Sequence, residues 1–235
     1  MRILVTRPAE DAAALIASLI SLGHDPIAAP VMRIAFFAGP RLDLRGAQGF
    51  LATSANGVRA LGRRTDNRIL PVFAVGDATA GAAETVGFQI RHSAKGNVET
   101  LADLVIETAD PKAGALLHAA GETLAGDLAG FLRATGFSYR RETLYRAEPA
   151  SVLDTKAEQA IRDGTVEAAL LHSPRSAKIF RALVERAGLA AAARKLVFFC
   201  LSDAVARTLE PLAPRRIAIA PRPNQESLLG LIGRD

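Results

Sequence analysis

The stretch Phe50-Leu51-Ala52-Thr53-Ser54-Ala55-Asn56-Gly57-Val58 predicts a short buried strand that ends in a small polar turn. A helix follows from Val58 to Arg63, because Leu61 returns three residues after Val58, which is helical spacing. Such a strand–turn–helix leaves unpaired backbone N–H groups at the carboxyl edge of the sheet, where open α/β sheets bind anions. The same pattern recurs in Leu170-Leu171-His172-Ser173-Pro174-Arg175-Ser176-Ala177, so we expect two sheets that face one cleft.

Strands and helices alternate along the rest of the chain. Leu15, Leu19 and Leu22 form one helical stripe that Gly23 closes, as is typical of a helix with a glycine cap. This alternation favours parallel sheets that are covered by helices on both faces. The expected strands are 3–6, 26–29, 49–53, 70–75, 88–91, 115–119, 137–140, 166–171, 196–201 and 217–220. The expected helices are 11–22, 58–63, 78–86, 96–106, 123–134, 154–161, 176–187, 204–212 and 225–232.

The segments repeat in rotated order along the chain. Residues 3–36 resemble residues 116–149, the stretch around Ser54 corresponds to that around Ser173, and residues 97–101 correspond to residues 224–228. This order predicts two five-stranded domains, one continuous and one assembled from both ends of the chain. The predicted domains are 1–36 plus 148–235 and 37–147, joined by two extended crossings near 31–37 and 143–148.

Composition limits the class of protein and its partners. About half of the 235 residues are apolar, which is enough for sizeable cores. The net charge of +5 fits a solvated basic surface, a nucleic-acid face or a site for a small polyanion. The sequence has no Lys/Arg run and no aromatic platform, so we expect no nucleic-acid partner.

The sequence also indicates a cellular compartment. Cys200 is the only cysteine and cannot form an internal disulfide, which fits a reducing cytoplasm. The N-terminal strand is cut off by Pro8 and is too short for a signal peptide. No apolar run approaches the ~20 residues that span a bilayer. We therefore expect a cytoplasmic protein without membrane contact.

The sequence lacks the motifs of several common α/β enzymes. Neither a dinucleotide-binding fingerprint nor a P-loop occurs, and no Cys/His cluster has zinc spacing. Thr53 and Ala119 end strands where a phospho-acceptor signalling domain would need an aspartate. His118 and His172 also end strands, but we expect structural roles for both. The expectation is a site without a metal or a cofactor.

Small polar turns remain as the candidate site. They are Thr6-Arg7-Pro8, 53–57, 76–79, Gly96-Asn97, 121–123, 173–176 and Ser202-Asp203. Turns that begin helices offer N–H groups that suit a ligand with several carboxylates or phosphates. Ser, Thr, Asn and Asp are also ordinary N-caps, and any single turn fits that simpler interpretation better. The doubling of the turns around an expected cleft favours binding.

The ordered set of motifs resembles the uroporphyrinogen-III synthase family over nearly the whole chain. The stretches that carry the resemblance are Ile3-Leu4-Val5-Thr6-Arg7-Pro8, Ala52-Thr53-Ser54-Ala55-Asn56-Gly57-Val58, Ala74-Val75-Gly76-Asp77-Ala78-Thr79-Ala80, Leu144-Tyr145-Arg146-Ala147 and Ser173-Pro174-Arg175-Ser176-Ala177. The resemblance implies two flavodoxin-like α/β domains, each a five-stranded parallel sheet with helices on both faces, joined by a two-stranded link. It also implies cyclisation of hydroxymethylbilane with inversion of ring D and loss of water, without a cofactor.

The resemblance also implies which residues hold the substrate, a linear tetrapyrrole polycarboxylate. The family binds its carboxylates largely through backbone amides and small hydroxyls, which carries over to Thr6, Ser54, Asn56, Gly76 and Ser173. The same turns add further candidate contacts, namely Arg7, Gly96, Asn97, Ser176 and Ser202. Ser202-Asp203-Ala204-Val205 departs from the family's Gly-x-x-Thr, so a hydroxyl contact there is missing or displaced to Ser202.

Tyr145 matches the family's tyrosine near the interdomain strand and is the candidate catalytic residue. A phenol can donate a hydrogen bond to the departing hydroxyl of the substrate, and the alternative is an aromatic ring that only packs. The competing function is a non-catalytic two-domain binder of small polyanions. A monomer is the default expectation, with a transient contact to the preceding pathway enzyme as a further partner.

Overall fold

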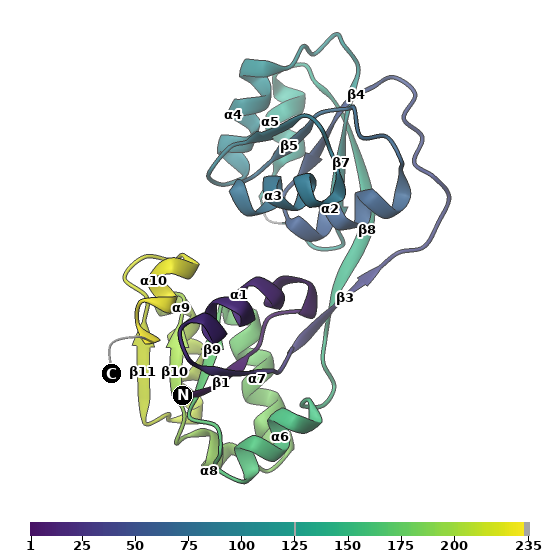
Figure 1. Ribbon diagram of the computed structural model, residues 1–235. Helices are drawn as coiled ribbons and strands as arrows, with labels where there is room; N and C mark the ends of the chain where they lie inside the picture. The colour runs from purple at the N-terminus through teal and green to yellow at the C-terminus, as the bar shows by residue number, and fades with distance from the viewer. Residues whose placement is uncertain (125, 233–235) are drawn as a thin grey trace. The chain divides into compact units, whose positions relative to one another are not determined.

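The computed structural model describes residues 1–124 and 126–232, and the chain divides into two compact units (Figure 1). Unit 1 consists of Met1–Arg33 and Glu148–Asp235, and unit 2 is Ile34–Ala147. The first division falls inside strand β3 (Met32–Phe36), so residues 34–36 lie in unit 2 and not in the predicted domain 1–36.

Unit 1 contains a five-stranded sheet in the order β11-β10-β9-β1-β2, and neighbouring strands in it are parallel. Its strands are β1 (Arg2–Val5), β2 (Asp25–Ala28), β9 (Ala168–Leu171), β10 (Val197–Cys200) and β11 (Arg216–Ile219). Its helices are α1 (Ala9–Ser21), α6 (Thr155–Arg162), α7 (Pro174–Arg186), α8 (Ala190–Ala193), α9 (Asp203–Leu209), the 3-10 turn Glu210–Leu212 and α10 (Gln225–Leu229).

Unit 2 contains a sheet in the order β3-β8-β7-β4-β5-β6, in which β8, β7, β4, β5 and β6 are parallel. Its strands are β4 (Ala47–Ala52), β5 (Val72–Ala74), β6 (Arg91–Ser93), β7 (Ala115–Gly121) and most of β8 (Ser138–Pro149), with β3 at the edge. Its helices are α2 (Ala55–Arg64), α3 (Asp77–Val86), α4 (Val98–Thr108) and α5 (Leu128–Ala134).

The second sheet has six strands where the sequence predicted five, because the crossing strand β3 pairs with β8. The Phe37 N–H donates to the Leu144 carbonyl, and the Ala150 N–H donates to the Val31 carbonyl, so the two strands run in opposite directions. The two segments that the sequence predicted separately, 137–140 and 143–148, are one continuous strand, β8.

The two sheets have the same strand order once the rotation of the repeat is applied. In unit 1 the order β2-β1-β9-β10-β11 is the 2-1-3-4-5 order of flavodoxin-like domains. The repeat places β1 on β7, β2 on β8 and β9 on β4, which turns that order into the β8-β7-β4-β5-β6 of unit 2. The predicted fold class, two flavodoxin-like α/β domains, is confirmed.

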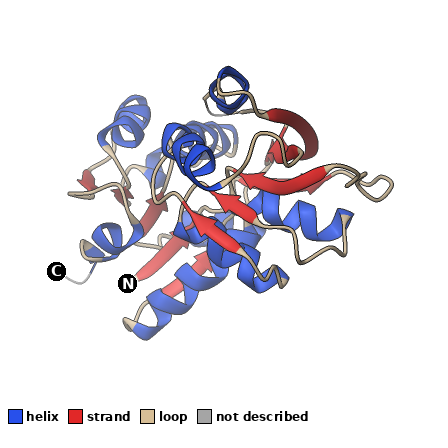
Figure 2. Cartoon of the chain, turned by 90° about the horizontal axis from the view of Figure 1, so that it is seen from above, coloured by secondary structure: helices blue, strands red, loops and turns tan. Residues whose placement is uncertain are grey.

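Each sheet is buried on both faces, as the apolar strands predicted. Phe50 and Ala52 belong to one core cluster of unit 2 and Leu51 belongs to the other, and all three are 0% exposed. In unit 1, Leu4 faces one cluster while Ile3 and Val5 face the other. Helices lie on either side of the strands, as the secondary-structure colouring in Figure 2 shows.

Two predicted elements are wrong in position. The helix expected from residue 123 begins only at Leu128, because the Asp127 carboxylate caps it by accepting from the Gly130 N–H. The strand expected at 88–91 starts at Arg91, because Gly87 takes a left-handed conformation (φ 98°) and the Phe88 N–H still bonds to the Ala83 carbonyl. Phe88 is apolar because it is a buried residue of the turn, not of a strand.

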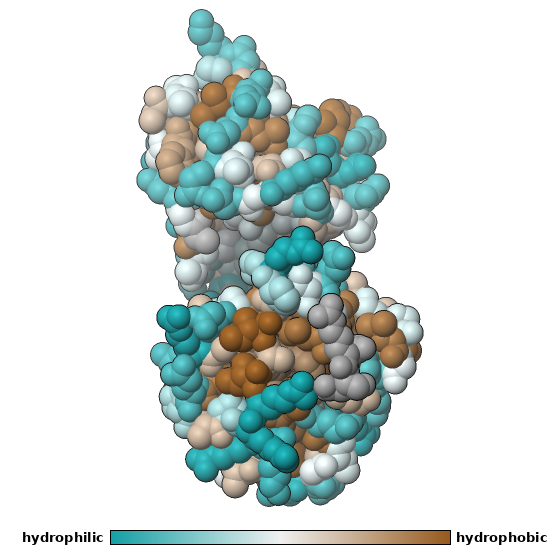
Figure 3. All heavy atoms as spheres, turned by 90° about the vertical axis from the view of Figure 1, so that its left-hand side faces the viewer, coloured by the Kyte–Doolittle hydropathy of each residue, from teal (hydrophilic) through white to brown (hydrophobic). Residues whose placement is uncertain are grey.

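The described surface mixes polar and apolar side chains, as the face in Figure 3 shows for each unit. Large exposed apolar residues include Ile20, Leu22, Val152 and Ile219 in unit 1, and Ile69, Ile90, Ile106, Leu124 and Phe131 in unit 2. Within the residues that the structure describes, no helix has the length and apolar character needed to cross a membrane.

We expect Gly57→Ala to destabilise the protein by about 1–3 kcal/mol, because a Cβ there would overlap the backbone carbonyl oxygen of Ala119. Gly81→Ala is the matched control in helix α3, since a Cβ at Gly81 meets no atom within 4 Å. The free energy of unfolding of this control should rise by about 0.5–1 kcal/mol. Urea denaturation measures both, and equal stabilities of the two variants would contradict the proposed close approach of α2 to β7.

Candidate functional site

The predicted turns follow strands that are parallel within each sheet, so they lie at the carboxyl edge of the sheet of their own unit. Three of the predicted side chains act as N-caps. Ser54 accepts from the Gly57 N–H at 3.1 Å, Asn97 from the Thr100 N–H at 3.0 Å, and Ser173 from the Ser176 N–H at 3.1 Å. Since a helix begins with four unpaired N–H groups, one side-chain cap leaves further donors in the first turn.

The first turns of these helices differ in charge. Among the described helices that begin at a predicted turn, α2 and α7 have no acidic residue in the first turn. The others carry Glu10 and Asp11 in α1, Asp77 in α3, Glu99 in α4 and Asp203 in α9. A carboxylate at a helix N-terminus occupies the place that a substrate carboxylate would take. The turns at Ser54 and Ser173, one in each unit, are therefore the best candidates of the set for binding an anion.

Tyr145 and Ser54, both predicted as site residues, are hydrogen-bonded. The phenol oxygen of Tyr145 lies 2.6 Å from the Ser54 Oγ, and either atom can donate. The Ser54 oxygen also accepts from the Gly57 N–H at the start of α2. This geometry places a phenol against a serine that the helix N-terminus polarises.

Gly121 makes the Tyr145–Ser54 contact possible. Strand β7 lies between β8, which carries Tyr145, and β4, which leads to Ser54. A Cβ on Gly121 would come within 2.9 Å of the tyrosine ring, so the ring reaches across the end of β7 only because this position has no side chain. The register of β7 and β8 also shifts between Ala120 and Gly121, which pairs Gly121 with Tyr145.

The other predicted residues have more local partners. The Thr6 hydroxyl donates to the Leu170 carbonyl at 2.6 Å, and Thr6 is 1% exposed. The hydroxyl proton therefore links the end of β1 to β9. The Asn56 Oδ1 accepts from Arg59 at 2.6 Å. Asn97 forms a capping box with Thr100 and follows directly on Gly96. These bonds support capping and packing roles in unit 1 and unit 2.

The remaining turn residues are open or paired with each other. A Cβ on Gly76 would meet no atom within 4 Å, so a ligand can approach this backbone, although Asp77 follows it. Ser173 and Ser176 share a hydroxyl–hydroxyl hydrogen bond of 2.7 Å. Ser202 makes no side-chain cap bond to α9.

The loop 121–123, which the sequence predicted to begin a helix, does not do so. Arg141 donates to the carbonyls of Gly121 and Glu122 at 2.8 and 2.9 Å, and residues 122 and 123 form a bend and not a helical turn. The prediction that this turn offers helix N–H groups is therefore wrong.

The comparisons with known proteins place the chain in a family. The family model described as uroporphyrinogen-III synthase HemD matches residues 13–230. This chain belongs to the uroporphyrinogen-III synthase family. Members of this family are lyases of tetrapyrrole biosynthesis, so the chain is an enzyme, and the alternative of a non-catalytic polyanion binder is not favoured. No curated protein sequence is a significant match.

The fold of the chain is similar to that of a solved member of the family. The uroporphyrinogen-III synthetase of Helicobacter pylori has 15% identity and a TM-score of 0.66, over 99% of this chain and 98% of that one. A mutant uroporphyrinogen III synthase of the thermophile Thermus thermophilus has 16% identity and a TM-score of 0.49, over 100% and 98%.

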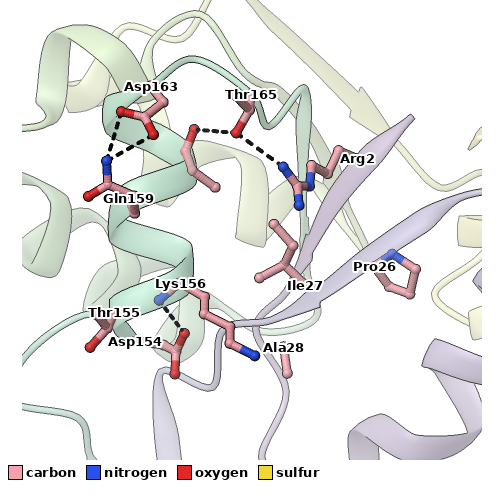
Figure 4. Close-up of a pocket in the computed structure, with 11 residues that line it drawn as sticks. Arg2, Pro26, Ile27, Ala28, Asp154, Thr155, Lys156, Gln159, Asp163 and Thr165 are labelled. Atoms are coloured by element: carbon pink, nitrogen blue, oxygen red, sulfur yellow. Dashed lines mark hydrogen bonds between the residues drawn. The ribbon is translucent and has the colours of Figure 1, made fainter.

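One cavity of the structure lies away from the turns of this synthase fold. A pocket of about 830 Å³ lies in unit 1 between edge strand β2 and helix α6 (Figure 4). Arg2, which donates to the Thr165 hydroxyl at 3.3 Å, and Lys156 line it. None of the predicted site residues lines this pocket. In the described part of the chain, no group of three or more His, Cys, Asp or Glu side chains is arranged to hold a metal ion.

Two strand-end histidines are buried in neutral form near the carboxyl edges. Burial, together with the Arg141 charge, lowers the pKa of His118 to about 4, and burial together with the Arg7 charge does the same for His172. Neither ring nitrogen of His172 has a hydrogen-bond partner among the described residues. Arg7 itself donates to the Gln225 side chain at 3.4 Å and pairs with Asp11 at 3.7 Å.

The sequence did not single out the environment of His118. Its Nε2 lies 3.1 Å from the Thr53 hydroxyl and its Nδ1 lies 2.6 Å from the Tyr139 hydroxyl. The one signal in the sequence was the position of His118 at the end of a buried strand, next to the strand that ends at Thr53. That signal did not reveal Tyr139 as a partner, because Tyr139 lies on a third element, β8.

We expect the free energy of unfolding to fall as the pH is lowered from 6.5 towards 4. The folded pKa of His118 and of His172 is about 4 against an ordinary value of 6.5, so the unfolded chain binds more protons below pH 6.5. Each histidine then lowers the free energy of unfolding by up to about 2 kcal/mol between pH 6.5 and pH 5.

Urea titrations at pH 7.5, 6 and 5 measure this loss. The variant His118→Gln removes one of the two buried imidazoles and should reduce the pH dependence by about half over that range. Equal pH dependence in the wild type and in His118→Gln would show that His118 is not held neutral by burial.

Proposed function

We propose that this chain closes the linear tetrapyrrole hydroxymethylbilane, with inversion of ring D and loss of water, to give uroporphyrinogen III. Family membership supports this reaction. The observation that carries the proposal is the 2.6 Å hydrogen bond between Tyr145 and Ser54 at the N-terminus of α2. It joins a proton donor to an anion-binding helix end at the carboxyl edge of the sheet.

In this proposal the turns hold the carboxylates of the substrate. The first turns of α2 and α7 bind them most strongly, because neither contains an acidic residue and each keeps unpaired N–H groups. Gly76 offers a further backbone contact because the space around it is open. The other predicted residues remain proposed contacts, and they act mainly by fixing the shape of these turns. They are Thr6, Arg7, Asn56, Gly96, Asn97, Ser176 and Ser202.

Tyr145 supplies the proton for the leaving group. The phenol proton passes to the hydroxyl of the substrate, and the carbon–oxygen bond breaks. Water departs, and the substrate becomes an electrophilic azafulvene. The Ser54 hydroxyl donates to the phenol oxygen and stabilises the negative charge that develops there, while the Gly57 N–H polarises Ser54. When the ring carbon later loses its proton, that proton returns to the phenolate and restores the phenol. The net change in the substrate is the loss of one water.

Holding the flexible chain supplies the selectivity of the reaction. The substituted carbon of ring D must attack first, which gives a spiro intermediate and leads to inversion. Fixing the carboxylates at several helix N-termini orients this carbon without further acid–base groups, so catalysis is largely positional. This proposal requires neither a cofactor nor a metal.

We also propose that the chain acts as a monomer in the cytoplasm, with a transient contact to the enzyme that supplies hydroxymethylbilane. The buried thiol of Cys200 supports a reducing compartment, because burial raises its pKa to about 12 and leaves it a small apolar core residue. Sedimentation of the purified chain tests the monomer.

The reaction is tested by supplying enzymatically made hydroxymethylbilane and resolving the product isomers. We expect the inverted type III isomer at a rate well above spontaneous closure. Formation of only the type I isomer, at the spontaneous rate, would refute the proposed activity.

We expect Tyr145→Phe to lower kcat by roughly 10²-fold with little change in stability, because it keeps the ring and removes the proton donor. Ser54→Ala should lower kcat in the same direction and by less, since it removes one hydrogen bond to the phenol oxygen. The matched control is Thr143→Val, a hydroxyl deletion at an exposed position of the same strand, which should leave kcat unchanged. Near-normal turnover of a stable Tyr145→Phe protein would make Tyr145 a packing residue.

A further inference from the structure

A chain of three polar side chains runs across one face of the unit 2 sheet to its carboxyl edge. His118 on β7 is 2% exposed and lies between Tyr139 on β8 and Thr53, which follows β4. The sheet register explains the alignment: Leu116 pairs with Tyr139 and Leu51 pairs with His118. Because every second residue of a strand shares a face, Tyr139, His118 and Thr53 lie on the same side.

Both ring nitrogens of His118 are hydrogen-bonded to the other two side chains, Tyr139 and Thr53. Its Nδ1 lies 2.6 Å from the Tyr139 oxygen and its Nε2 lies 3.1 Å from the Thr53 oxygen. Burial and the nearby Arg141 keep the ring neutral, so one nitrogen carries a proton and the other accepts one. The two hydrogen bonds that join Tyr139, His118 and Thr53 must therefore run in the same direction, either from Tyr139 towards Thr53 or from Thr53 towards Tyr139.

The two directions differ in what they present at the carboxyl edge. If Thr53 donates to Nε2, then its only proton is used inside the protein and its oxygen faces outward as an acceptor. If Tyr139 donates to Nδ1, then Nε2–H donates to the Thr53 oxygen and the threonine proton points outward. Only the second direction suits a carboxylate, which accepts hydrogen bonds and repels an outward lone pair.

We propose that His118 is a positioning residue whose tautomer sets the Thr53 hydroxyl as a donor to a carboxylate of the substrate. This inference rests on the proposed function, since it takes a polycarboxylate as the ligand. Thr53 is partly exposed and directly precedes Ser54, the cap of the α2 anion site. Binding of the carboxylate selects the tautomer with the proton on Nε2, and Tyr139 supplies the hydrogen bond that Nδ1 then accepts.

The kinetic test compares Thr53→Val, His118→Leu and the double variant with the wild type. Thr53→Val should raise KM about tenfold with little change in kcat, because it removes one charge-assisted hydrogen bond made equally in the ground and transition states. His118→Leu should raise KM similarly, and the double variant should be no worse than either single variant. His118→Gln should restore most of the affinity, because an amide can donate to Thr53 and accept from Tyr139.

A second measurement reports the tautomer directly and does not depend on variants that fold poorly. Nitrogen NMR of ¹⁵N-histidine-labelled wild-type protein should place the His118 proton on Nε2 when uroporphyrinogen III saturates the protein under anaerobic conditions. Tyr139→Phe removes the donor to Nδ1 and should weaken that preference while also raising KM.

The outcomes separate this inference from the proposed function. A wild-type protein that forms no type III product refutes the function, and this inference with it. Wild-type turnover with an unchanged KM in Thr53→Val, or additive effects of Thr53→Val and His118→Leu, would refute the positioning role alone. A His118 proton on Nδ1 in the saturated protein would do the same.

Discussion

The structure depends on the burial of short apolar strands on both faces of each sheet. Phe50, Leu51 and Ala52 alternate between two core clusters with no exposed surface, and β4 ends level with its neighbour β5 at the carboxyl edge. There the chain must turn into a helix, and Gly57 packs against the carbonyl of Ala119 to bring α2 onto the sheet. The unpaired N–H groups of the proposed anion site follow from this packing, not from a separate binding motif.

The fold was readable from the sequence because its signals are local and repeated. Apolar runs, glycine caps and the rotated repeat predicted two five-stranded parallel domains, and the family resemblance implied the flavodoxin-like class. The errors arose where a tertiary contact overrides local pattern. Arg141 holds the carbonyls of Gly121 and Glu122 and delays α5, and β3 joins the second sheet through a partner about a hundred residues away.

The candidate site was predictable as a set of turns but not as a set of contacts. Capping by Ser54 and Ser173 follows from residue type and position. The Tyr145–Ser54 bond joins residues 91 positions apart and requires the ring to cross the end of β7 over Gly121. Pairing of that kind depends on strand order and register together, and a single sequence specifies these only after the fold is known.

The repeat also suggests how the proposed work is divided between the two units. Ser54 and Ser173 occupy equivalent positions and cap their helices at the same 3.1 Å, but the second partner of the hydroxyl differs. In unit 1 it is Ser176, which stands where unit 2 has Gly57. The repeat position of Tyr145 is Met32, which has no proton to give. Both units thus retain a proposed anion-binding turn, whereas the proposed acid chemistry belongs to unit 2, where Gly121 at the end of β7 leaves room for the phenol ring.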